Sequence, residues 1–169
     1  MRLLLLGLWL GAAIFFGAAV APALFNVLRG AGLANANELA GSIVTRLLRI
    51  INHGGFEIAL FLFVTAFFIN RNRRPLARYA EVISLAIMAI MTGVSQFFIS
   101  ARMLELRGSM GVPIDQVASA DPRRIAFDTL HRYSVTIMGI AIIAALVAFF
   151  LASRPGRLTD PAWPNDNQG

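Results

Sequence analysis

The residues best suited to chemistry in this 169-residue chain are two histidines, a glutamate and two amides that stand within or beside long apolar stretches. They are Asn26, His53, Glu57, Gln96 and His131. Polar side chains of this kind are costly inside a membrane and often mark a functional site. An ionised Glu57 near the centre of a bilayer would cost about 2.5–3.5 kcal/mol. We therefore expect Glu57 to pair with another group, to face a cavity or to carry a proton.

The spacing around His53 predicts a polar stripe on one helix. Arg46, Arg49, His53 and Glu57 follow one another at intervals of three or four residues, so they share a helix face. His53 is one turn from Glu57 and is its nearest candidate partner. Two interpretations stay open, namely a structural hydrogen bond that holds helices together and a ligand or proton site.

His131 lies in the polar segment that precedes the last long apolar run. Asp128 stands three residues before it and could orient the imidazole ring. A histidine at this position could equally extend to the lipid headgroups. With alternating helix direction, all five polar residues fall in the same half of the bilayer.

The two histidines and the glutamate form a candidate metal set. We expect His53, Glu57 and His131 to converge on one cavity, where they could share a transition metal or flank a haem. Such ligands suit zinc, iron or copper better than magnesium or calcium. The alternative is a satisfied polar network that fixes helix register, and the small number of ligands favours it. We therefore expect no cofactor, with haem or a transition metal as the alternative.

The composition predicts an integral membrane protein. Hydrophobic residues make up 57% and charged residues 14%, whereas soluble domains average roughly 45–50% and about 25%. All 15 basic residues are arginine, the formal net charge is +6, and there is no cysteine. Disulfides, thiolate metal sites and a cysteine nucleophile are thereby excluded. We expect the lipid bilayer as the main partner and no nucleic acid, because basic loops in an apolar chain are typical of membrane anchoring.

The apolar runs predict an all-α fold, a four-helix transmembrane bundle in residues 1–153. Each run is long enough for a hydrocarbon core that needs roughly 20 helical residues. Three helices extend beyond the membrane, and Asp121-Pro122 is a start signal for the last one. The tail, residues 154–169, is predicted to be disordered. The expected helices are residues 3–28, 37–70, 76–107 and 122–153.

Small residues at helical spacing, Gly7, Gly11 and Gly17, mark one face of the first helix. Such stripes let membrane helices approach closely. We expect a packing seam inside the bundle, with a homo-oligomer contact as the alternative.

Arginine density predicts the orientation in an inner (cytoplasmic) membrane. The short connection between the second and third helices holds Arg71, Arg73, Arg74 and Arg78, which places both termini in the cytoplasm. Arginines on the other side are more numerous but are spread over longer segments that also hold acids. The first run could instead be a cleaved secretory signal, but its length favours an uncleaved helix.

Several short segments together resemble the transmembrane protein 205-like family, in its bacterial branch with a domain-of-unknown-function label. The resemblance covers about residues 5–150 and implies a four-helix membrane protein without an established activity. The chain is also loosely similar to the copper-resistance-D-like membrane group, in which helix-borne histidines matter. The segments are Trp9-Leu10-Gly11, Ala21-Pro22-Ala23-Leu24-Phe25, Glu38-Leu39-Ala40-Gly41, Ala101-Arg102-Met103, Leu106-Arg107 and Leu130-His131-Arg132-Tyr133-Ser134.

Three functional hypotheses follow from the sequence. The first is a non-enzymatic membrane protein, an accessory or permeation component. The second is a haem- or metal-binding redox protein that uses His53 and His131, and the third is a proton-coupled carrier that uses Glu57. The sequence does not decide whether the protein is an enzyme, although it carries no motif of the common soluble enzymes.

Overall fold

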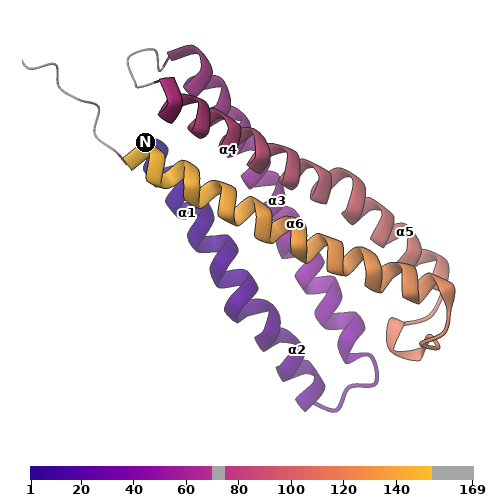
Figure 1. Ribbon diagram of the computed structural model, residues 1–169. Coiled ribbons are helices and arrows are strands. Elements are labelled where there is room, and N and C mark those ends of the chain that lie inside the picture. The colour runs from indigo at the N-terminus through magenta and orange to yellow at the C-terminus, as the bar shows by residue number, and fades with distance from the viewer. Residues whose placement is uncertain (70–74, 154–169) are drawn as a thin grey trace, which may run out of the picture.

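The computed structural model describes residues 1–69 and 75–153, which form helices without a strand (Figure 1). Four of its continuous helical stretches are long and apolar enough to cross a membrane, so the predicted all-α four-helix bundle is confirmed. The predicted disorder of residues 154–169 and the three arginines of residues 71–74 lie outside the described residues. The elements are α1 (Arg2–Phe15), η1 (Phe16–Val20), α2 (Ala21–Gly30), α3 (Ala36–Ile69), α4 (Pro75–Val94), η2 (Ser95–Ile99), α5 (Ser100–Met110), η3 (Ile114–Gln116) and α6 (Pro122–Ser153).

The helix boundaries lie within two residues of the predicted ones except at the end of the third helix. This helix does not stop at residue 107 but continues to Met110 and ends at Gly111 with φ 70°. Glycine adopts this left-handed conformation without steric cost, so the stop lies at the glycine that follows the last turn. The start of α6 at Pro122 is confirmed, and Asp121 caps it by accepting a hydrogen bond from the Arg123 backbone N–H at 2.8 Å.

Two π-helical turns interrupt the first and third helices. In η1 the N–H of Ala21 donates to the carbonyl of Phe16, five residues back, and Pro22 follows directly. Proline has no N–H to donate and its ring crowds the preceding turn, which accounts for the widened turn at this place. In η2 the carbonyl of Ser95 accepts both the N–H and, at 2.8 Å, the hydroxyl of Ser100.

Near the termini the four helices pack around one core. Here α1 contacts α3 and α6, and α4 contacts the same two helices, so α3 and α6 lie diagonally opposite. The core joins large side chains such as Leu62 and Met88 with small ones on α6, where Ala141 and Ala145 are fully buried. The small side chains on α6 leave room for the larger residues that face them.

Trp9 forms the contact between α1 and α3. Its indole N–H donates to the carbonyl of Ile51 at 2.9 Å, and its ring lies against Gly55. A Cβ at Gly55 would stand 2.4 Å from the indole nitrogen, so only glycine fits at this position. The close approach of α1 and α3 therefore depends on one glycine of α3.

The predicted glycine seam on α1 is largely wrong. Gly7 lies at ordinary contact distance from Phe149, since a Cβ at Gly7 would stand 3.5 Å from its ring. Gly11 and Gly17 are exposed, and a Cβ at either would meet nothing within 4 Å. Trp9 and Ala13 face the core instead, because the bundle presents a different side of α1 to its neighbours.

At the other end the bundle opens into two pairs of helices. There α2 packs against α3, and α5 packs against α6. Figure 1 shows that the line of α1 and α2 meets α6 near the termini and diverges from it towards the loops. We refer to this end, which carries residues 31–35 and 111–121, as the loop end.

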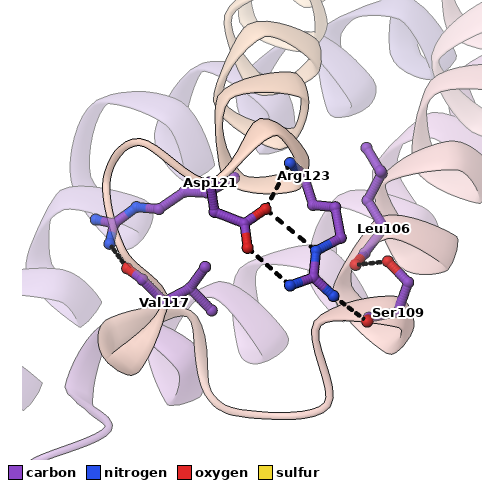
Figure 2. A network of polar contacts seen from close by, with 6 residues as sticks. Leu106, Ser109, Val117, Asp121 and Arg123 are labelled. Carbon is purple, nitrogen blue, oxygen red and sulfur yellow. Dashed lines mark hydrogen bonds and ion pairs between the residues drawn. The ribbon is translucent and has the colours of Figure 1, made fainter.

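The connection between α5 and α6 is held by one arginine (Figure 2). The guanidinium of Arg123 donates to Asp121 at 2.7 and 3.1 Å and to the carbonyl of Ser109 at 2.6 Å. The side-chain hydrogen bonds from Arg123, followed by its backbone N–H, lower the pKa of Asp121 from 3.8 to about 2. Arg123 thereby ties the last turn of α5 to the first turn of α6.

Candidate functional site

A cleft of about 590 Å³ lies between the two helix pairs at the loop end, and we call it the loop-end cleft. Its volume falls within the roughly 300–1,000 Å³ of pockets for small molecules. Helices α2, α3, α5 and α6 and the short η3 turn all contribute to its walls. The residues that line it are Pro22, Phe25, Asn26, Arg29, Asn37, Gly41, Val44, Thr45, Leu48, Ser100, Met103, Arg107, Ile114, Asp115, Arg124, Phe127, Asp128, His131 and Ser134.

Three arginines from three different helices reach this cleft. Arg29 of α2 lies over the Phe25 ring, 5.3 Å from its centroid, and its Nε donates to Asn37 at 2.8 Å. Arg107 of α5 lies 5.2 Å from the centroid of the Phe127 ring. Arg124 of α6 donates to the carbonyl of Val117. Aromatic contacts of this kind position guanidinium groups and leave edges available to hydrogen-bond an anion.

Glycine allows Arg107 to lie flat on α3. The Nη2 atom of Arg107 lies 2.8 Å from the place that a Cβ at Gly41 would occupy. The Nε atom of Arg107 is 3.4 Å from Glu38 Oε1, and the side chain is 18% exposed. Arg107 is thus a half-buried cation of the cleft and joins α5 to the start of α3.

The η3 turn closes the cleft through Asp115. Its carboxylate accepts hydrogen bonds from the Asn37 amide at 2.6 Å and from the Glu38 backbone N–H at 3.0 Å. Partial burial alone would raise the pKa of Asp115, but these hydrogen bonds outweigh burial and hold the pKa below 3.8. Glu38 in turn accepts the N–H of Ile114 at 3.2 Å. Asp115 is therefore ionised at neutral pH and fixes the loop to the first turn of α3.

The remaining walls of the cleft are apolar. Phe25 of α2, Val44 and Leu48 of α3, Met103 of α5 and Phe127 of α6 all line it. A cavity with arginines on one part of its wall and aliphatic or aromatic side chains on another matches a ligand that has a charged head and an apolar body.

The structure divides the five predicted polar residues between two places. Asn26 and His131 line the loop-end cleft, whereas His53, Glu57 and Gln96 line a separate groove on the outside of the bundle. The predicted convergence of His53, Glu57 and His131 is therefore wrong. The reason is that α3 and α6 lie diagonally opposite and His53 points away from the bundle interior. Among residues 1–69 and 75–153, no three His, Asp or Glu side chains are grouped so that they could hold a metal ion.

The outer groove measures about 530 Å³ and contains the predicted His–Glu pair. His53 Nε2 lies 3.2 Å from Glu57 Oε1, and the two side chains are 56% and 66% exposed. The predicted pairing within α3 is present, but it faces outwards. Asp128 and His131 both line the loop-end cleft, and the orienting contact between them stays a prediction.

Comparison with known proteins places the chain in a family. The sequence model of a domain of unknown function, DUF4149, matches residues 4–111. The chain belongs to this family. No curated protein and no solved structure matches the chain. The DUF4149 region covers α1 to α5 and most of the cleft, but His131 and the whole of α6 lie beyond it.

Within the DUF4149 region the structure identifies polar residues that the sequence reasoning missed. Asn52 is fully buried and donates to Ser95 Oγ at 3.0 Å, and its Oδ1 atom has no hydrogen-bond partner among the described residues. Glu81 is 2% exposed and lies 3.3 Å from Arg2. Both are polar residues that interrupt apolar sequence, and this pattern is the sequence signal that could have identified them. Asn52 stands one residue before His53 and therefore faces a different side of α3.

Proposed function

We propose that this protein is a non-enzymatic membrane component that binds an amphipathic anion in the loop-end cleft. The observation that carries the proposal is the arrival of Arg29, Arg107 and Arg124 from three helices at one cavity with apolar walls. Guanidinium groups match carboxylate and phosphate heads through paired hydrogen bonds. The apolar wall suits an alkyl or prenyl body. The proposal thus adds a class of ligand, an amphipathic anion, to the accessory role that the sequence predicts.

The alternative functions find less support in the geometry. A redox role for His53 and His131 would need both rings at one group, but they line different cavities. A proton-coupled carrier would need Glu57 on a path through the protein, but its side chain is exposed on the outside of the bundle. The resemblance to the transmembrane protein 205-like family stays a prediction.

The proposal includes a location and an orientation. An inner (cytoplasmic) membrane with both termini in the cytoplasm follows from the dense arginines of residues 71–78. The loop-end cleft then belongs to the opposite half of the bilayer. Reporter fusions after Arg74 and after Gly111 test this orientation, with cytoplasmic activity expected for the first alone. Cytoplasmic activity for the second fusion alone would reverse it.

Lipid binding to the purified protein tests the ligand class. Native mass spectrometry compares dioleoyl phosphatidate with dioleoyl phosphatidylcholine, which has the same chains without a net charge. We expect retention of the phosphatidate and about tenfold weaker binding in Arg124→Gln, which corresponds to ~1.4 kcal/mol. Equal binding of both lipids would refute the role of the arginines.

A matched variant controls for general loss of charge. Arg132→Gln removes an exposed arginine from the same helix, and Arg132 does not line the cleft. We expect it to bind phosphatidate like the unaltered protein. If Arg132→Gln and Arg124→Gln weaken binding equally, the attraction is a property of the surface charge and the cleft is not the site.

A further inference from the structure

The outer groove is a second feature that the loop-end cleft does not explain. It lies between α3 and the π-helical turn η2. Its residues combine a cation, an imidazole, a carboxylate and an amide with apolar side chains. They are Arg49, Ile50, His53, Gly54, Glu57, Gln96 and Phe97.

The depth of this groove makes its exposure unusual. The apolar part of α3 runs from Ile50 to Ile69, so Glu57 lies about 10 Å along the helix from the start of that part, at 1.5 Å per residue. Charged side chains at such depth almost always face a bundle interior, a water-filled cavity or a pairing group. Glu57 is paired with His53, but the two side chains are 66% and 56% exposed on the outside of this chain. The pair as a whole therefore lacks cover within one copy.

We propose that a second copy of this chain covers the outer groove, which makes the protein a homodimer with α3 of each copy at the interface. The groove offers both signs of charge within two helical turns, with Arg49 and His53 on one side of Glu57. A surface that carries donor and acceptor together is complementary to itself under a two-fold axis. Each Glu57 then meets His53 of the other copy.

The membrane favours a second copy over an unrelated partner. A two-fold axis along the bilayer normal holds both copies at the same depth, so each residue meets itself or a neighbour one turn away. His53 and Glu57 are one turn apart, and their side chains already approach to 3.2 Å within one helix. A different protein would have to supply both charges at this same depth.

One further observation fits a helix in the groove. A Cβ at Gly54 would meet nothing within 4 Å, so this glycine leaves a notch where the backbone of another helix can come close.

Cysteine cross-linking in membranes tests the interface directly, because the chain has no cysteine of its own. Gly54→Cys places a single thiol in the notch, and oxidation should give a disulfide-linked dimer. Val135→Cys is the control, since Val135 is 60% exposed on the diagonally opposite helix α6. We expect cross-linked dimer for Gly54→Cys and little for Val135→Cys. Equal cross-linking of both, or none at Gly54, would overturn the proposal.

Counting the copies in each complex tests how much Glu57 contributes to the stability of the dimer. Single-molecule photobleaching of labelled protein in liposomes should show two steps for the unaltered chain and a dimer about tenfold weaker for Glu57→Gln. Glu105→Gln is a matched control, because Glu105 is also 66% exposed and pairs with Arg102 on its own helix, outside the groove. It should leave the dimer intact. The proposal would be overturned if the unaltered chain is a monomer, a larger assembly or a complex with another protein. Equal effects of the two variants on the dimer would also overturn it.

Discussion

Replacement of Gly55 by alanine should separate α1 from α3. The added methyl group would stand 2.4 Å from Trp9 Nε1 and 2.7 Å from Trp9 Cε2, far inside van der Waals contact. Trp9 is 4% exposed and belongs to the main core, so its ring cannot turn outwards without opening the bundle. Gly139 of α6 is the internal control, because a Cβ there meets nothing within 4 Å and this glycine lies outside the outer groove.

The expected loss can be worked out from these contacts. Overpacking of a well-packed core costs about 1–3 kcal/mol, and loss of the hydrogen bond from Trp9 to Ile51 adds about 1 kcal/mol. Alanine is more favourable than glycine in a helix interior by about 1 kcal/mol, which offsets part of this loss of stability. Gly55→Ala should therefore lose about 1–3 kcal/mol, whereas Gly139→Ala should be neutral or gain up to about 1 kcal/mol.

Thermal unfolding in detergent measures the difference between the two variants. The expected difference of about 1–4 kcal/mol corresponds to roughly 2–16 °C in a chain of this size. The emission of Trp9 offers a second readout once Trp163, the other tryptophan, is changed to phenylalanine. Equal melting temperatures for the two variants, with unchanged Trp9 emission, would show that the Trp9–Gly55 contact does not hold α1 in place.

Two further predictions concern other contacts. Gly11→Leu should leave the melting temperature unchanged, within about 0.5 kcal/mol, because Gly11 is exposed and a Cβ there has open space. A large loss in the same assay would place a neighbour at this face. The pKa of Asp121 is about 2 in the folded chain and 3.8 by itself, so its contribution to stability is complete above pH 3.8 and is lost as the pH falls towards 2. Melting curves between pH 2 and pH 5 should show this loss, and Asp121→Asn, which keeps a cap oxygen, should flatten it.

The sequence by itself determined the number of membrane helices and most of their ends. Their length follows from runs of apolar residues, and Asp121 beside Pro122 starts α6 through contacts within one turn. These features are local, so no partner segment is needed to predict them. The pairing of His53 with Glu57 is local in the same way, because residues four apart on a helix are neighbours.

Only the tertiary structure decided which side of each helix faces inwards. In a membrane helix both the inner and the outer face are apolar, so hydrophobic periodicity does not reveal the rotation about the helix axis. Gly11 and Gly55 are both glycines, yet Gly11 is exposed and Gly55 lies against the Trp9 ring. Only the position of the neighbouring helix distinguishes them. The loop-end cleft depends further on the divergence of two helix pairs and on Arg107 reaching across to Glu38, 69 residues earlier in the chain. Contacts over such separations arise from packing, which is why His53 and His131 came to lie in different cavities.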